Sequence, residues 1–126
     1  MRESILKISA FALLIFLASC SPRVDVAPFG TLPSEPTTGD IDVYTNTSSI
    51  AKPYREIALI TVDDEGWDRG EGELINTILE EARKIGADGV IILSQETVDK
   101  GGTFVAGTYI QSQGKVFKAT AIAYNE

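Results

Sequence analysis

The sequence has 126 residues, with 11 basic and 18 acidic side chains, a net charge of −7 at neutral pH, one cysteine and no histidine. This composition excludes Ser-His-Asp and Cys-His catalysis, zinc, haem and iron–sulfur sites, and any disulfide within the chain. Nucleic acid and anionic lipid headgroups repel such an acidic chain, so neither is expected as a partner of the folded part, and no cofactor is expected.

The first residues have the parts of an export signal. Arg2 and Lys7 give a short basic start, and residues 8–17 form an apolar run. The run is shorter than the about 20 residues that a membrane-spanning helix needs. The next segment, Leu17-Ala18-Ser19-Cys20, resembles the lipobox of bacterial lipoprotein precursors. This resemblance implies that residues 1–19 are a signal peptide and that Cys20 carries a thioether-linked diacylglycerol. The alternative is an ordinary secretory leader with a coincidental cysteine.

A lipid on Cys20 predicts lasting membrane attachment. Two or three acyl chains bind a bilayer nearly irreversibly, at about 0.8 kcal/mol per buried CH₂. Ser21 stands where an Asp would mark retention in the inner membrane, so its presence resembles the outer-membrane class of lipoproteins. The expected location is therefore the cell envelope, with the protein at the outer membrane and facing the periplasm.

Residues 20–40 are expected to form a flexible tether. The segment holds four of the five prolines among Ser, Thr and Gly. Such a composition favours extended chain, which at about 3.1 Å per residue would reach up to about 60 Å from the membrane. The alternative, a tail packed on the domain, stays open for Val24–Phe29.

From residue 41 to 126 the pattern predicts a small folded domain. Ile41–Tyr44 alternates like a short strand, and Ile57–Val62 is apolar on both faces, which is typical of a covered strand. A helix follows, and its apolar stripe at 3.6-residue spacing consists of Leu74, Ile75, Ile78, Leu79, Ala82 and Ile85. Asp68 and Glu71 fit a capping box at its start, and Gly86 fits a left-handed stop at its end.

Three further strands are expected after the helix. Val90–Leu93 is a buried strand, and the order strand, helix, strand predicts a β-α-β crossover. Turns are expected at residues 100–102 and 113–114, which separate strands 104–111 and 116–124 in an antiparallel meander. The predicted fold is α+β in the order β-β-α-β-β-β, with one helix on a mixed, mostly antiparallel sheet of about five strands.

The last predicted strand has a face of small side chains. Phe117, Ala119, Ala121 and Ala123 alternate with larger residues, so they share one face. A row of alanines permits close approach of a helix. We therefore expect the helix of residues 74–85 to pack over this row.

Three segments together resemble a family of small bacterial α+β domains. They are Lys52-Pro53-Tyr54-Arg55-Glu56-Ile57-Ala58, then residues 82–92 (ARKIGADGVII), then Ala119-Thr120-Ala121-Ile122. The family includes the YbjQ-like proteins and RcsF-like envelope lipoproteins. The resemblance implies the fold but no chemistry. The sensor of this family has disulfides in its domain, whereas this chain has no cysteine there, and a heavy-metal role finds no Cys or His ligands.

The segment of residues 63–73 is the one candidate for a ligand site. Its acidic residues are Asp63, Asp64, Glu65, Asp68, Glu71 and Glu73. Oxygen ligands at this density suit Ca²⁺ or Mg²⁺, although the spacing matches no calcium loop, and a solvated loop is the alternative. A carboxylate pair acting as acid and base is a weaker possibility. The glycines do not form a phosphate loop, because the order is wrong and the acids repel phosphate.

Trp67 lies in the same loop. An exposed tryptophan is a typical anchor for a protein partner, and the alternative is that the ring folds back over an apolar edge. With an anchor, a small domain and no catalytic constellation, the sequence predicts a non-catalytic envelope module. Its partner is expected to be another envelope protein or a second copy of the chain. Binding of a small ligand or divalent cation at residues 63–73 is the second hypothesis, and a carboxylate-dependent hydrolase is the third.

Overall fold

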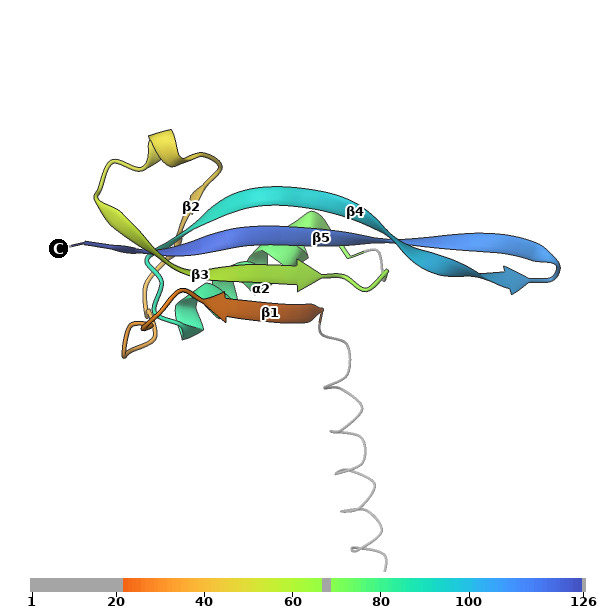
Figure 1. Cartoon of the computed structure of the whole chain (residues 1–126), viewed down its shortest axis with the longest axis horizontal. Helices are drawn as coiled ribbons and strands as arrows, with labels where there is room; N and C mark the ends of the chain where they lie inside the picture. Colours follow the sequence, from red (N-terminus) through yellow and green to blue (C-terminus); the bar gives the residue numbers. More distant parts are fainter. Residues whose placement is uncertain (1–21, 67–68, 126) are drawn as a thin grey trace, which may run out of the picture.

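The computed structural model describes residues 22–66 and 69–125. One helix lies on one face of a single five-stranded sheet (Figure 1). The elements in chain order are β1 (Arg23–Pro28), β2 (Asp42–Tyr44), the short 3₁₀ helix η1 (Thr47–Ser49), β3 (Tyr54–Asp63), α2 (Glu71–Lys84), β4 (Gly89–Val105) and β5 (Thr108–Tyr124). The predicted α+β class, with one helix on a mixed, mostly antiparallel sheet, is confirmed.

The strands follow the order β1-β3-β5-β4-β2. The central strand β5 is antiparallel to both β3 and β4, so β3 and β4 run in the same direction with β5 between them. The short strand β2 pairs with β4 in parallel. The connection from β3 through α2 to β4 is thus a β-α-β unit split by one strand. Three strands precede the helix and two follow it, whereas the sequence predicted two and three.

The segment that was expected to be a tether begins with a strand. Arg23–Pro28 pairs with β3 along its whole length, from Arg23 opposite Asp63 to Pro28 opposite Ala58. Val24 and Val26 pack against the core, and Asp25 between them is exposed. The tether prediction is wrong for this stretch, and the alternative left open for Val24–Phe29 is correct. The physical reason is the alternation of valines, which suits an edge strand even where prolines flank it.

The rest of the predicted tether rests on the end of the helix. The Thr37 amide donates a hydrogen bond to the Arg83 carbonyl at 2.9 Å, and the Thr37 hydroxyl donates to the Ala87 carbonyl at 2.6 Å. Pro33 and Glu35 lie directly against Gly86. Only three steps of chain therefore separate Cys20 from the first strand, a reach of about 10 Å in place of about 60 Å.

The helix ends as the sequence predicts. Gly86 has φ of +80°, its amide donates to the Arg83 carbonyl at 3.1 Å, and the Ala87 amide donates to the Ala82 carbonyl at 2.9 Å. These two bonds form a Schellman motif, which satisfies carbonyls that the helix leaves without partners. The predicted N-cap, Asp68, lies outside the described residues. The observed N-cap is Gly70, which has no side chain to form a capping hydrogen bond.

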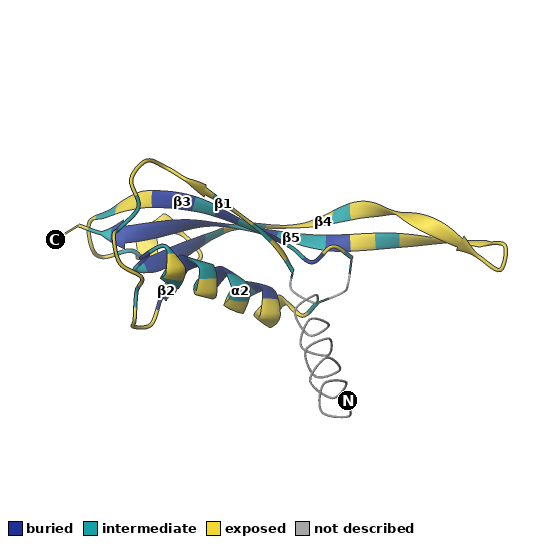
Figure 2. Ribbon diagram, turned by 90° about the horizontal axis from the view of Figure 1, so that it is seen from below, coloured by how far each residue is buried: buried dark blue, intermediate teal, exposed yellow. Residues whose placement is uncertain are grey.

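The core lies between the helix and one face of the sheet. Leu74, Ile78 and Ala82 of the helix are buried there, as Figure 2 shows along the side of α2 that faces the strands. Phe117, Ala119, Ala121 and Ala123 of β5 belong to the same buried cluster. The predicted packing of the helix against the alanine face is confirmed. On the other face of β3, Leu59 and Thr61 are only half-buried, so the expectation of a strand covered on both sides is wrong there.

The alanine face predicts the cost of an overpacked core. Ala121 is completely buried in the cluster that contains the inner side of α2. Ala121→Leu is expected to lower the free energy of unfolding by about 1–3 kcal/mol, because the extra methyl groups push the helix away from the sheet. Thermal or urea unfolding would measure this loss. Unchanged stability would contradict the placement of the helix.

The predicted meander of three strands is instead one hairpin of two long strands. β4 and β5 each contain 17 residues and pair from Gly89 opposite Ile122 to Val105 opposite Thr108. The only turn is Ala106-Gly107, where both residues have positive φ, 50° and 81°. Two positive φ angles are typical of the two-residue turn that suits a twisted hairpin.

Both predicted turns in this region are wrong, because Gly102 and Gly114 lie within strands at points where other groups approach closely. At residues 100–102 the chain forms a bulge between Asp99 and Gly102, and the strand continues. A side chain on Gly102 would collide with the Tyr109 ring, which lies across it. Gly114 is buried within β5 beneath the side chains of Lys100 and Asp64. Glycine inside a strand often marks such a close approach, which sequence patterns do not distinguish from a turn.

Candidate functional site

The outer half of the hairpin projects from the domain as a free arm. β3 follows β5 only as far as Asp63 opposite Val116. Beyond this pair β4 and β5 continue alone, and we define residues 97–115 as the arm (Figures 1 and 2). Eight residues of β5 at about 3.4 Å each give it a length of about 30 Å. Of the described residues, no other segment extends so far from the core.

Beyond its base, the arm has no described strand beside either edge. β2 covers β4 only at Gly89–Ile91, and no described strand follows β4 on that side from Ile92 to Val105. Most arm residues, including all of residues 99–111, are exposed. An isolated two-stranded hairpin is marginally stable in water, so the arm depends on its base and on whatever it contacts.

Acidic residues of the 63–73 segment brace the base of the arm. The Lys100 ammonium donates to the Asp63 carboxylate at 2.5 Å and forms a salt bridge with it. The Asp64 amide donates to the Lys115 carbonyl at 3.0 Å, and one oxygen of the Asp64 carboxylate accepts the Lys115 amide at 2.8 Å and the Gly66 amide at 2.9 Å. The loop after β3 thus binds both strands of the hairpin where they leave the sheet.

Asp64 is almost completely buried at this position, with 1% of its surface exposed. Its second carboxylate oxygen has no hydrogen-bond partner among the described residues. A buried carboxylate is stable only when neighbouring groups form hydrogen bonds with it. Two backbone amides donate hydrogen bonds to its first oxygen and so offset part of the cost of burial. Asp64 therefore fixes the start of the arm to the loop after β3 through its hydrogen bonds with Lys115.

The brace predicts that the arm loosens in acid. Burial raises the pKa of Asp63, but the hydrogen bond and charge of Lys100, with the Glu65 amide, outweigh it and hold the pKa below its ordinary value. A lowered pKa stabilises the fold above the ordinary value of about 3.9, and this contribution disappears as pH falls through the lowered pKa. Protection of arm amides against hydrogen exchange, corrected for intrinsic rates, is therefore expected to fall in that range.

Asp63→Asn distinguishes the effect of protonating Asp63 from the effects of protonating other carboxylates. The variant is expected to show weaker arm protection already at neutral pH and a smaller further loss in acid. Glu80→Gln, on the exposed side of α2, serves as the matched control and should behave as the parent chain. Equal protection in Asp63→Asn and the parent at neutral pH would contradict a bracing role.

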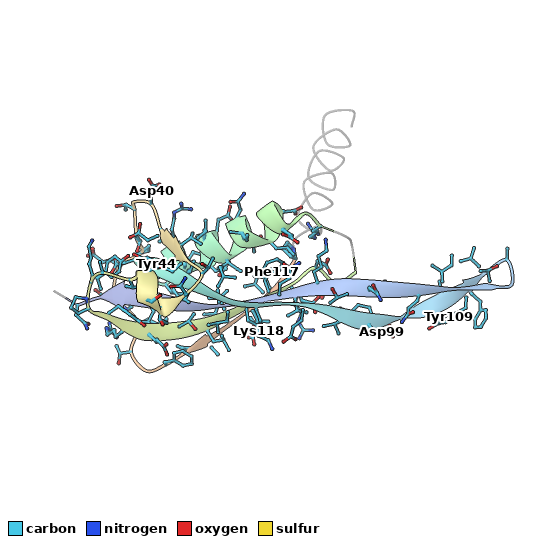
Figure 3. All side chains as sticks on the ribbon, turned by 90° about the horizontal axis from the view of Figure 1, so that it is seen from above. Asp40, Tyr44, Asp99, Tyr109, Phe117 and Lys118 are labelled. Carbon is cyan, nitrogen blue, oxygen red and sulfur yellow. The ribbon has the colours of Figure 1, made fainter. Side chains whose placement is uncertain are left out.

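A second set of contacts shapes the arm at its bulge. One carboxylate oxygen of Asp99 accepts the Gly101 amide at 2.8 Å, and the other accepts the Gln111 side-chain amide at 2.6 Å. Gly101 has φ of +81°, a conformation that glycine adopts readily at the bulge. Asp99 therefore stabilises the bulge and links the two strands. Figure 3 shows Asp99 and Tyr109 along this part of the ribbon.

The end of the arm is apolar on both faces. Phe104 and Tyr109 are opposite each other, with ring centroids 5.3 Å apart, and they share one face. Val105 and Ile110 lie on the other face, since they are displaced by one residue along their strands. All four side chains are more than half exposed, and Phe104 is 73% exposed. We call residues 101–110 the tip. Large exposed apolar groups gathered at one point mark a contact surface.

A further polar cluster lies at the opposite end of the sheet. The Tyr124 hydroxyl donates to the Asp42 carboxylate at 2.5 Å and lies 2.6 Å from the Tyr44 hydroxyl. Burial, followed by the hydrogen bonds with Asp42 and Tyr44, raises the pKa of Tyr124. The phenol therefore stays neutral and ties β2 to the end of β5, and no described cavity adjoins it. A shallow depression of about 190 Å³ lies elsewhere, between β1 and β3, and is lined by Arg23, Asp25, Thr61 and Asp63.

The predicted site residues have different outcomes. Cys20 and Trp67 lie outside the described residues, so both predictions remain predictions. Several acids of the 63–73 segment have side-chain partners: Asp63 with Lys100, Glu71 with Gln95 at 2.9 Å, and Glu73 with Arg69 at 2.6 Å. The described part of the segment and of the chain contains no group of three acids placed to hold a metal ion. None of the described helices is long and apolar enough to cross a membrane.

Sequence reasoning missed the arm and its tip. The signal that could have found them is the stretch from Gly101 to Gly114, which contains no charged residue in a chain where about a quarter of the residues are charged. No family model matches the sequence, and no curated protein or solved structure matches it significantly.

Proposed function

We propose that this chain is a lipid-anchored, non-catalytic module of the bacterial cell envelope that binds another envelope protein through the unpaired edge of β4. The anchor is the lipid expected on Cys20, and the location expected from Ser21 is the outer membrane. The observation that supports binding is the length of β4, from Ile92 to Val105, whose outer edge pairs with no described strand. An exposed edge of this kind is a template for a strand of another chain.

The chemistry of this edge favours a basic partner segment. Between its two bulges β4 pairs regularly with β5 from Ser94 to Asp99, so the opposite edge continues over this stretch without a bulge. Glu96 is exposed there, 3.8 Å from the Lys118 ammonium, and the whole chain is acidic. Charge complementarity therefore favours an extended segment with Lys or Arg side chains. A partner strand would also cover the inner part of a ribbon that is marginal on its own.

Site-specific crosslinking in cells would test the proposal. A photoreactive amino acid at Thr97, an exposed residue of the β4 edge, is expected to form a protein adduct in the membrane fraction. The same amino acid at Glu80, on the exposed side of α2, is the matched control and should form none. Glu96→Lys is expected to reduce the yield at Thr97. Absence of any protein adduct at Thr97, or equal yields at both positions, would contradict binding at this edge.

A further inference from the structure

The tip, residues 101–110, contains no charged residue, whereas the rest of the arm does. The tip consists of Gly, Thr, Val, Ala, Phe, Tyr and Ile, and the nearest charged residues in the sequence are Lys100 and Lys115. Its apolar side chains point to both faces of the ribbon. A flat protein surface would cover one face only, whereas insertion into a fluid apolar layer would cover both. From this chemistry and from the position of the anchor, we propose that the tip inserts into the surface of the bilayer to which Cys20 is attached.

The position of the first strand supports this occupant. Arg23 pairs with Asp63, and Asp63 pairs with Val116, so β1 starts at the level where the arm leaves the sheet. Figure 1 shows β1 beginning on the side of the domain from which the arm projects. Three steps of chain connect Arg23 to Cys20, a reach of about 10 Å. Two strand spacings, together about 10 Å, separate Arg23 from Val116, so the base of the arm lies within about 20 Å of the lipid attachment. An arm of about 30 Å therefore reaches the same membrane when it lies obliquely.

The types of side chain fit the interfacial layer rather than the hydrocarbon interior. Tyr109 has an apolar ring and a polar hydroxyl, the combination that is enriched at membrane–water interfaces. Thr103 and Thr108 add hydroxyls near the turn. The ribbon has unpaired backbone groups on both edges, and these are not tolerated in the hydrocarbon core. Insertion is therefore limited to the level of the headgroups and the first part of the acyl chains, about 5–10 Å deep.

Charge permits this contact although the chain as a whole is acidic. The sequence predicts repulsion from anionic headgroups, and that expectation applies to the charged surface of the domain. The uncharged tip is the part that can approach lipid without this cost. The anchor keeps the tip at a high local concentration near the bilayer, so weak insertion is sufficient. Its effect would be to fix the orientation of the domain, with the β4 edge at a defined height above the membrane.

Tryptophan fluorescence on vesicles would test insertion without relying on lipidation in cells. The chain from Cys20 onward, which includes every described residue, has one cysteine and one tryptophan. In a Trp67→Phe background, Phe104→Trp places the only tryptophan in the tip. The Cys20 thiol is then coupled to a maleimide lipid in phosphatidylcholine vesicles. Coupling is expected to shift the emission to shorter wavelength, and brominated acyl chains are expected to quench it.

Two further variants make the result specific. Phe29→Trp places the tryptophan at a half-exposed position just beyond the other end of β1, and it should show neither shift nor quenching. Val105→Asp adds a charge to the opposite, exposed face of the tip and is expected to abolish quenching of the tryptophan at position 104. Emission at position 104 that does not change on coupling would overturn the proposal. So would equal quenching at position 29, or quenching that persists in Val105→Asp.

Crosslinking at the tip distinguishes contact with lipid from contact with a protein partner. A photoreactive amino acid at position 104 is expected to yield phospholipid adducts in the membrane fraction. A protein adduct there, with no quenching on vesicles, would overturn insertion and assign the tip to a protein partner. Failure of the β4 edge proposal at Thr97 leaves this vesicle result unaffected, so the two proposals can fail separately.

Discussion

In the membrane fraction the protein is expected to have the mass of a chain that begins at Cys20 and bears diacylglycerol. Cys20→Ala is expected to lose this modification completely, because Cys20 is the only thiol of the sequence and a thioether cannot form without it. Intact mass spectrometry of membrane and soluble fractions would measure both the modification and the location of the chain. Membrane attachment should be lost together with the lipid, since the acyl chains supply the binding to the bilayer, at about 0.8 kcal/mol per buried CH₂.

A neighbouring substitution provides the control. Ser21→Ala changes a small residue beside the cysteine and should keep both the lipid and the membrane location. Ser21→Asp should keep the lipid but, if sorting follows the expected rule, shift the protein toward the inner membrane. An unmodified parent chain in the soluble fraction would contradict the anchor. The fold and the arm would not be affected by that outcome, whereas insertion of the tip into the anchoring bilayer would lose its basis.

The free chain between the expected lipid on Cys20 and the folded domain is shorter than the sequence suggested. Prolines and small polar residues in positions 20–40 indicate a flexible tether. In the structure β1 starts at Arg23, and Thr37 is bonded to the end of α2. With the proposed lipid on Cys20, the folded domain would lie close to the membrane rather than up to about 60 Å from it. This closeness would allow an arm of about 30 Å to reach the bilayer.

Local signals allowed the helix and its end to be predicted from the sequence. The apolar stripe of residues 74–85 has the helical period, and its buried members Leu74, Ile78 and Ala82 face the sheet. Gly86 adopts the left-handed conformation that ends helices, and the alanine face of β5 accepts the helix. These features depend on residues close together in the sequence or on strict alternation along one strand, which a pattern records directly.

The arm could not be predicted, because its determinants are contacts between distant residues. Lys100-Gly101-Gly102 has the composition of a turn, yet Asp99 and Gln111 hold it as a bulge within a continuous ladder. Ala106-Gly107 lacks the Asn-Gly or Asp-Gly pair that usually marks a two-residue hairpin turn. Two of the acids considered as candidates for a ligand site, Asp63 and Asp64, brace this arm, and this bracing depends on Asp63 meeting Lys100 across 37 positions of sequence.

Gly86→Ala is expected to destabilise the fold by about 2–5 kcal/mol. Left-handed backbone costs a residue with a Cβ about 1–2 kcal/mol, and overpacking typically costs a further 1–3 kcal/mol. A Cβ at this position would lie 2.6 Å from the Glu35 carbonyl oxygen and 2.7 Å from the Pro33 Cβ. Urea unfolding would measure the loss. Gly72→Ala, in the first turn of α2 with open space around it, is the matched control and should not lose stability.

A second substitution tests whether residues 29–40 are packed on the helix. Pro33→Gly removes one of the two groups that a Cβ on Gly86 would meet, so the double variant should cost less than the sum of the single variants. The difference is a coupling energy, which is expected only between residues in contact. If residues 29–40 were a free tether, Gly86→Ala would cost only the backbone strain of about 1–2 kcal/mol. Pro33→Gly would then leave that cost unchanged, and the short connection between membrane and domain would have to be abandoned.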